Sequence, residues 1–161
     1  MSTIRAATAA DLPAVAAVYA PYVLDSVITF EETPPEPSAW REKLTAGLPF
    51  LVAEVDGRVA GFAYAGRYRP RPAYRYSLED SIYLAPWAQG RGLGRALLAA
   101  LVSACRDSGA GQLIAVIADT GDPSSVKLHL AAGFEEVGRL RRVGFKHGRW
   151  VDTTLLQLAL D

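Results

Sequence analysis

A glycine-rich loop that opens a long apolar helix pattern is the feature that most constrains this chain. Residues 89–94 read Gln-Gly-Arg-Gly-Leu-Gly, after a strand pattern and before a helix pattern that includes Cys105. Backbone N–H groups in such a loop can converge on an anion at the positive end of the helix. Glycine suits this place because a side chain would block close approach of the backbone and disfavour positive φ. The pattern predicts a phosphate-binding loop, with a plain glycine-rich turn as the alternative.

Two other kinds of phosphate-binding loop do not fit the sequence. A Walker A loop needs Gly-Lys-Ser/Thr, and residues 89–94 contain no lysine. A dinucleotide-binding loop follows the first strand of its domain and has an acidic residue about 20 positions later. Here the loop lies in the middle of the chain, behind several strands that read as antiparallel. Its position therefore disfavours both an ATPase and a dehydrogenase.

Composition sets the class of protein. The 161 residues are half apolar, which is enough for a substantial core, and we expect one domain spanning residues 1–161. Seventeen basic residues balance seventeen acidic ones, so no overall field favours nucleic acid or an anionic membrane as a partner. The N-terminal region lacks a secretory signal pattern and no apolar run has membrane-spanning length, so we expect a cytoplasmic protein. The single cysteine, Cys105, excludes an internal disulfide and a cysteine-based metal cluster, and we predict no metal site.

Hydrophobic periodicity predicts strands and helices in alternation. The predicted elements are a short strand at 3–6, a helix from a capping box at Thr8 and Asp11 to about Tyr22, a helix between Ser38 and Gly47, two strands joined at Asp56-Gly57, a strand before Pro86, the helix after the glycine loop, a buried strand at 112–119, a short helix before Gly133 and two final strands. The strand, glycine loop, helix and strand in the middle form a βαβ unit.

The residues around the loop resemble a known family. Q-G-R-G-L-G-R-A-L-L is similar to the Q/R-x-x-G-x-G/A loop of the GCN5-related N-acetyltransferases, in which it binds the pyrophosphate of acetyl-CoA. The order of elements resembles that fold over essentially the whole chain. The resemblance implies an α+β (mixed α/β) fold, with a central, mostly antiparallel twisted sheet, helices on both faces and a V-shaped strand split that binds acetyl-CoA. The cofactor-binding residues it implies are Tyr83, Leu84, Ala85, Gln89, Gly90, Arg91, Gly92, Leu93, Gly94, Arg95, Ala96 and Asp122.

Several further blocks resemble the phosphinothricin and methionine sulfoximine acetyltransferase branch of that family. They are FEETPP, LVAEVDGRVAGFAYAG, AYRYSLEDSIYL, LHLAAGF and GFKHGRWVDTTLLQL. This resemblance implies acetyl transfer to the amino group of a small amino-acid-like substrate such as L-phosphinothricin or L-methionine sulfoximine. It also implies a homodimer with GFKHG near the shared active-site region. The chain departs from the branch at Asp122, where an Asn is usual, because a carboxylate cannot donate a hydrogen bond as an amide does.

Acetyl transfer needs a neutral amine, a stabilised oxyanion and a proton for the departing thiolate. Glu79 matches the catalytic glutamate of the branch, and we expect it to take the ammonium proton directly or through water. The neighbouring Asp80 is the alternative base, but strand alternation directs its side chain to the opposite face. His129 matches the branch's histidine and is expected to protonate the thiolate or help deprotonate the amine. A solvated carboxylate and a packing histidine are the structural alternatives.

The remaining roles follow from the same resemblance. The oxyanion is assigned to backbone N–H groups of Tyr83-Leu84-Ala85. The substrate-binding residues implied are Phe30, Glu31, Ala73, Tyr74, Arg75 and Lys146, and the guanidinium of Arg75 is expected to bind the substrate carboxylate bidentately. Two other functions stay open. One is acetylation of a different amine, such as a polyamine, an antibiotic or a protein N-terminus, and the other is a non-catalytic acyl-CoA-binding module.

Overall fold

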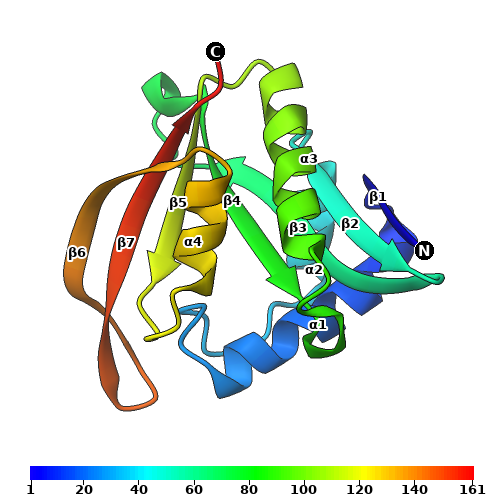
Figure 1. The fold of residues 1–161 in the computed structure, drawn as a ribbon, viewed down its shortest axis with the longest axis horizontal. Coiled ribbons are helices and arrows are strands. Elements are labelled where there is room, and N and C mark those ends of the chain that lie inside the picture. The colour runs from blue at the N-terminus through cyan, green and yellow to red at the C-terminus, as the bar shows by residue number, and fades with distance from the viewer.

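The computed structural model describes all 161 residues and shows one twisted sheet with helices on both faces (Figure 1). The strands are β1 (Ser2–Ala6), β2 (Phe50–Val55), β3 (Arg58–Arg67), β4 (Ser77–Leu84), β5 (Gln112–Ala118), β6 (Glu135–Lys146) and β7 (Arg149–Ala159). The helices are α1 (Leu12–Asp25), α2 (Pro37–Thr45), α3 (Leu93–Asp107) and α4 (Ser124–Ala131), with short 3-10 helices η1 (Ala9–Asp11), η2 (Pro72–Tyr74) and η3 (Pro86–Ala88). None of the helices has the length and hydropathy of a membrane span.

The sheet contains a single parallel pair in its centre. The strand order is β1-β2-β3-β4-β5-β7-β6, and every neighbouring pair is antiparallel except β4 and β5. Helix α3 makes the crossover that a parallel pair requires. β4 and β5 pair only at Ser77–Glu79 with Gln112–Ile114, and beyond these residues the two strands separate. The predicted mixed fold with a V-shaped strand split is confirmed.

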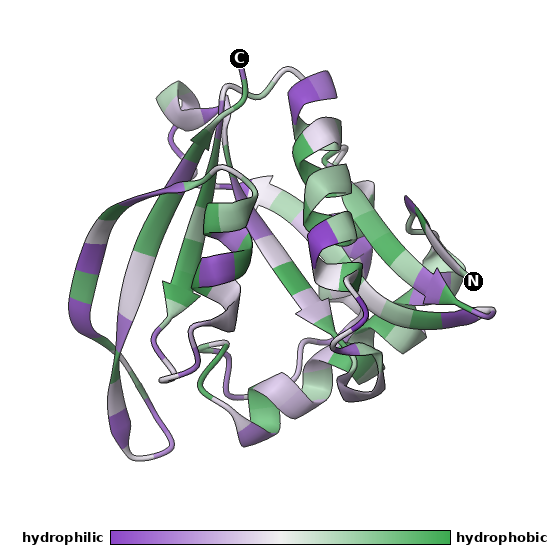
Figure 2. Ribbon diagram, in the orientation of Figure 1, coloured by the Kyte–Doolittle hydropathy of each residue, from purple (hydrophilic) through white to green (hydrophobic).

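Apolar side chains fill both faces of the sheet and fix the elements that carry the glycine loop. On one face Val15 and Tyr19 of α1 and Trp40 of α2 pack against strand residues that include Phe62. On the other face α3 packs on β2, β3 and β4 and buries Leu97, Leu98, Leu101 and Cys105 in a cluster that extends to β5 and β7. Figure 2 shows apolar residues along most of the length of β2, β3 and β5, as expected for strands that are covered on both faces. Each fully buried leucine contributes about 2 kcal/mol, so α3 is held firmly in place.

The predicted turn and thiol are confirmed, whereas two helix boundaries differ. Asp56 and Gly57 form the β2–β3 turn with φ of +50° and +80°. Cys105 is fully buried, and burial raises the pKa of its thiol to about 12. The first helix runs to Asp25, three residues past the predicted end at Tyr22, because Val23 is buried against the core. The second begins at Pro37 rather than after Ser38, since proline is already preset for the first turn of a helix.

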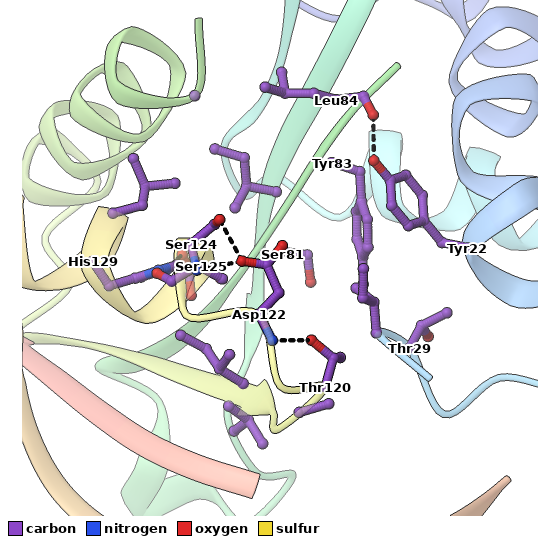
Figure 3. Close-up of a pocket in the computed structure, with 18 of the residues that line it drawn as sticks. Tyr22, Thr29, Ser81, Tyr83, Leu84, Thr120, Asp122, Ser124, Ser125 and His129 are labelled. Atoms are coloured by element: carbon purple, nitrogen blue, oxygen red, sulfur yellow. Dashed lines mark hydrogen bonds and ion pairs between the residues drawn. The ribbon is translucent and has the colours of Figure 1, made fainter. Parts of the chain in front are cut away.

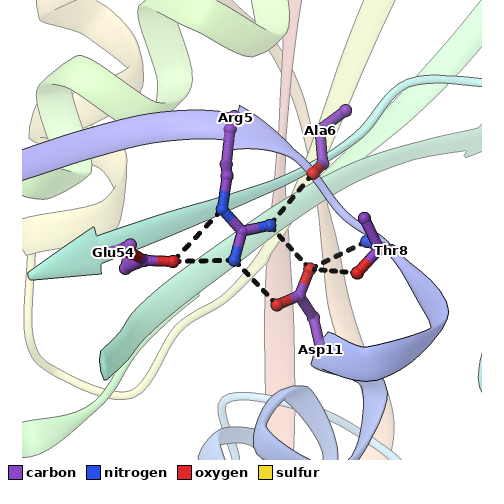
Figure 4. Close-up of polar contacts among 5 residues, drawn as sticks. All are labelled: Arg5, Ala6, Thr8, Asp11 and Glu54. Carbon is purple, nitrogen blue, oxygen red and sulfur yellow. Dashed lines mark hydrogen bonds and ion pairs between the residues drawn. The ribbon is translucent and has the colours of Figure 1, made fainter. Parts of the chain in front are cut away.

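A polar network joins the N-terminal strand to the start of α1 (Figure 4). The guanidinium of Arg5 donates to both carboxylate oxygens of Asp11 at 2.8 and 2.9 Å and to Glu54 of β2 at 2.7 Å. The carboxylate of Asp11 also accepts from the backbone N–H of Thr8 at 2.8 Å, so the predicted capping box is confirmed. Arg5 holds the pKa of Asp11 at about 2. The network ties β1, β2 and α1 together.

Replacing Asp11 should test this network. We expect Asp11→Ala to lower the free energy of unfolding by about 2 kcal/mol at neutral pH, because a helix cap and charged hydrogen bonds are lost together. The pKa of Asp11 is depressed in the folded chain, so the difference from wild type is complete above roughly pH 4 and disappears as pH falls toward 2. Urea unfolding across this pH range measures it. Asp56→Asn, which removes a fully exposed ion pair with the N-terminus, is the control and should change nothing measurable.

Candidate active site

A cavity of about 680 Å³ opens where β4 and β5 separate (Figure 3). Its walls come from the second half of β4, the end of β5, the start of α4, the segment after α1 and the glycine loop. Tyr22 and Tyr83 lie on one side in Figure 3, and Asp122, Ser124 and His129 lie on the other. The separation of two neighbouring strands thus creates an opening between their edges that reaches both faces of the sheet.

The open edge of β4 offers unpaired backbone groups to a ligand. The N–H of Ala85 donates to the carbonyl of Ala60 at 2.8 Å, on the side of β3. Because N–H groups point alternately to the two edges of a strand, those of Ile82 and Leu84 face the open edge. The hydroxyl of Tyr22 donates to the Leu84 carbonyl on that same edge. The prediction for Ala85 as an oxyanion donor is therefore wrong, as it is by alternation for Tyr83, while the N–H of Leu84 is correctly oriented.

The glycine loop adopts the conformation that its sequence predicts. Gly90 and Gly92 have φ of +77° and +75°, a region that favours glycine. Helix α3 begins at Leu93, and its first internal hydrogen bond runs from Ala96 N–H to Gly92 carbonyl. The N–H groups of residues 93–95 therefore have no partner within the helix. Gln89, Gly90 and Gly94 line the cavity, whereas the side chains of Arg91 and Arg95 are exposed.

Asp122 stands at the start of α4 and is engaged by its own helix. Its carboxylate accepts from the backbone N–H of Ser124 at 2.9 Å and from the Ser124 hydroxyl at 2.5 Å. These hydrogen bonds lower the pKa of Asp122. The residue lines the cavity, as predicted for a cofactor-binding position, but with its acceptor oxygen already used to begin the helix. The amide of an Asn at this position could donate a hydrogen bond to a ligand, whereas the carboxylate of Asp122 cannot.

Glu79 is the last β4 residue that pairs with β5, so it lies at the point of the split. Its side chain lines the cavity and is half-buried, and no other side chain donates a hydrogen bond to its carboxylate. Burial raises the pKa of Glu79, and the negative charge of Asp80 raises it further. A carboxylate with a raised pKa is more basic than an ordinary one, which suits a group that takes a proton from an ammonium.

Asp80 points to the face opposite Glu79, where it pairs with His129. The imidazole Nε2 lies 2.6 Å from Asp80 Oδ2, and the imidazole Nδ1 lies 2.7 Å from the backbone carbonyl of Ser125. Both side chains are at most 3% exposed. Strand alternation predicts the face of Asp80 correctly, but it does not predict His129 as its partner. A signal was present, since Asp80 alternates with the apolar Leu78 on that face and a buried carboxylate needs a partner.

The segment after α1 forms the wall near Glu79. Thr29, Phe30 and Glu31 line the cavity. Lys146 does not line it, contrary to its predicted place in the substrate site; it is 4% exposed, and its ammonium donates to the Thr29 carbonyl at 2.8 Å. Burial lowers the pKa of Lys146, and the nearby Glu32 and Glu31 oppose this effect. Lys146 thus fixes this segment to the β6–β7 hairpin rather than facing a ligand.

A glycine of the β6–β7 hairpin supports one aromatic residue of this wall. Gly144 lies directly under the ring of Phe30, and a Cβ atom at position 144 would come within 2.4 Å of Phe30 Cζ. β6 is irregular between Leu140 and Gly144, where Arg142 has φ of +52°. The irregular backbone of β6 and the lack of a side chain on Gly144 together leave room for the Phe30 ring.

Ala73, Tyr74 and Arg75 lie in the exposed turn η2 and its end, outside the cavity. The guanidinium of Arg75 donates to the Pro72 carbonyl at 2.9 Å and lies 5.0 Å from the centre of the Tyr76 ring. The structure therefore does not bring this predicted triplet to the site. No arginine or lysine lines the cavity, and His129 is its only basic side chain.

Comparisons with known proteins agree on the family. Residues 15–134 match the model of the acetyltransferase (GNAT) family. The chain is 49% identical to a phosphinothricin N-acetyltransferase of Alcaligenes faecalis, over 99% of this chain and 83% of that protein. It is 38% identical to an L-methionine sulfoximine/L-methionine sulfone acetyltransferase of Pseudomonas aeruginosa, over 99% of this chain and 95% of that protein.

A solved structure shows the same architecture with a ligand. The crystal structure of a GNAT superfamily phosphinothricin acetyltransferase from Sinorhizobium meliloti in complex with AcCoA is 46% identical in sequence, with a TM-score of 0.92 over 98% of this chain and 88% of that chain. The strand split, the glycine loop at the start of α3 and these comparisons together show that the chain belongs to the GNAT family of acetyltransferases, whose co-substrate is acetyl-CoA.

Proposed function

We propose that this chain transfers the acetyl group of acetyl-CoA to the amino group of a small amino-acid-like acceptor, such as L-phosphinothricin or L-methionine sulfoximine. The observation that carries the proposal is the position of Glu79, a carboxylate of raised pKa at the point where β4 and β5 separate. The activities named for relatives that are 38–49% identical over nearly the whole chain support the acceptor class. Since the reaction consumes acetyl-CoA, we place it in the cytoplasm.

The residues of the split fit acetyl-CoA, which supplies an activated acetyl thioester. The free N–H groups of residues 93–95 face out of the N-terminal end of α3, where a pyrophosphate is favoured. We assign phosphate binding to the backbone of residues 89–96, with Arg91 and Arg95 free to add charge from the rim. The exposed edge of β4 hydrogen-bonds an extended amide chain in the way that a strand edge accepts another strand. The N–H of Leu84 is the donor best oriented to stabilise negative charge on the acetyl carbonyl oxygen.

Glu79 is assigned the role of general base. An acceptor amine is protonated at neutral pH and must lose a proton before it can attack a carbonyl. The carboxylate of Glu79 faces the cavity without a competing hydrogen-bond donor and takes this proton directly or through water. Phe30 and Glu31 form the adjacent wall and are assigned to acceptor binding. Because no arginine or lysine of the chain lines the cavity, Ala73, Tyr74, Arg75 and Lys146 are not part of this proposal.

We also propose that the chain forms a homodimer through the β6–β7 hairpin. The apolar side chains exposed on this hairpin are Val137, Leu140, Val143, Phe145 and Trp150, with exposed fractions of 46–56%. β6 is the edge strand of the sheet, and Phe145 and Trp150 pack against each other with ring centres 4.8 Å apart. Exposed apolar clusters on an edge strand favour association. A second copy on this face lies next to Gly144 and Phe30, and so brings its own side chains close to the cavity.

A thiol-release assay tests the reaction and the acceptor class. We expect acetyl-CoA to be consumed with L-phosphinothricin or L-methionine sulfoximine and Glu79→Gln to lower kcat by roughly 10²–10⁴-fold while binding of acetyl-CoA persists. Glu42→Gln, at an exposed carboxylate of α2, is the control. Release only with polyamines, antibiotics or peptides would move the acceptor outside this class. Binding of acetyl-CoA without release for any amine would favour the non-catalytic module.

A glycine substitution tests the cofactor loop. We expect Gly92→Ala to raise the KM for acetyl-CoA about fivefold, since a side chain at positive φ costs about 1 kcal/mol and disturbs the start of α3. Gly57→Ala is a matched control, because Gly57 has φ of +80°, no neighbouring atoms within 4 Å of an added Cβ, and a place in the β2–β3 turn. Its KM should equal that of wild type. Equal increases in both variants would remove the loop from cofactor binding.

The mass of the protein in solution tests the dimer. Light scattering should give the mass of two chains for wild type and of one chain for Phe145→Glu, because a carboxylate at the centre of an apolar contact is not solvated. Ala99→Glu, on the exposed side of α3, should remain a dimer. A wild-type protein with the mass of one chain contradicts the proposal.

A further inference from the structure

Both ring nitrogens of His129 face oxygen atoms, and this fixes where the protons lie. The carbonyl of Ser125, 2.7 Å from Nδ1, has no proton to give, so Nδ1 carries one and donates it. Nε2 and Asp80 Oδ2 are 2.6 Å apart, which is too close for two lone pairs that face each other without a proton between them. One proton therefore lies between Nε2 and Oδ2.

That shared proton belongs to His129. In water an imidazole holds a proton more tightly than a carboxylate, by more than two pKa units. Burial lowers the pKa of His129, but the hydrogen bond and charge of Asp80 raise it by more, so that the pKa lies above its ordinary value. The pair is then an imidazolium beside a carboxylate, with no net charge, enclosed between β4 and α4. Phe134 covers the ring, with the two ring centres 4.9 Å apart.

Asp80 is also the covalent neighbour of Glu79, so the state of the pair determines the charge beside the catalytic carboxylate. The charge of Asp80 acts to raise the pKa of Glu79 and of Cys105, which faces it from α3. The other ionisable groups that line the cavity are Glu31, Asp122, Tyr19, Tyr22, Tyr64 and Tyr83. None of these is a cation, so His129 is the only positive charge available to offset Asp80.

We propose that Asp80 and His129 form a permanent ion pair in which His129 does not exchange its protons during turnover but acts as the counter-charge that lets Glu79 remain ionised. This inference rests on the proposed function of Glu79 as general base. Asp80 and His129 are then positioning residues that act through Glu79. An ammonium acceptor loses two protons when it becomes an amide. Glu79 takes the first, and the second, released from the nitrogen of the tetrahedral intermediate, goes to the departing thiolate, so neither transfer involves a proton of His129.

The pH dependence of the reaction distinguishes a counter-charge from a proton relay. In His129→Gln the charge of Asp80 is left unbalanced, so the acid limb of the kcat/KM profile should move up by about one pH unit, while the rate at high pH stays within about threefold of wild type. Removing both charges in Asp80→Asn/His129→Gln should return the limb to the wild-type position or below it. A loss of 100-fold or more at every pH, unrelieved in the double variant, would overturn the proposal.

A measurement without substrate tests the ion pair itself. The chain has two histidines, so His147→Asn leaves one imidazole, and asparagine tolerates the φ of +51° at position 147. Nitrogen-15 NMR of this variant should show both ring nitrogens of His129 protonated at pH 7, and the pKa of the ring should fall once Asp80→Asn is added. A bare Nε2 at pH 7 contradicts the proposal. If the His129 ring is protonated but the protein acetylates no amine, the ion pair is confirmed and the proposed role of Glu79 as general base is wrong.

Discussion

The separation of β4 from β5 is the constraint on which the site depends. Each of these strands is fully paired on its outer side, β4 with β3 and β5 with β7, so the sheet tolerates a gap between them. Leucines of α3 pack against the sheet on the β4 side of the gap and hold the glycine loop beside it. Unpaired N–H and C=O groups in such a gap need partners. A ligand with an extended amide chain supplies them, and the Tyr22 hydroxyl already satisfies one carbonyl.

Two adjacent acidic residues of β4, Glu79 and Asp80, lie beside this gap and serve different purposes. Strand alternation sends Glu79 toward the α1 side and Asp80 toward the α3 and α4 side, so the two carboxylates experience different surroundings although they share a peptide bond. Glu79 faces the cavity, and no side chain donates a hydrogen bond to its carboxylate. Asp80 meets a buried imidazole, which neutralises it. The chemistry of the site is thus set by which face of β4 each residue occupies.

The sequence predicted those parts of the site that are specified locally. Positive φ at Gly90 and Gly92, the Asp56-Gly57 turn and the opposed faces of Glu79 and Asp80 all follow from the properties of single residues or from strand periodicity. Contacts between distant segments were not predictable in this way. Asp80 and His129 are 49 positions apart, and Lys146 reaches a carbonyl 117 positions away, in a segment without periodicity. The position of the exposed turn at residues 72–75 relative to the cavity likewise does not follow from its own residues, and Arg75 does not line the cavity.

The contact between Phe30 and Gly144 bears on how acceptor preference changes among relatives. The ring forms part of the cavity wall, but the space it occupies is set from behind by a backbone atom that no acceptor touches. A single methyl group at position 144 shifts the ring while every residue that contacts the acceptor keeps its identity. Two relatives with identical cavity linings can therefore differ in the width of the cavity, and a comparison restricted to wall residues would attribute the same substrate range to both.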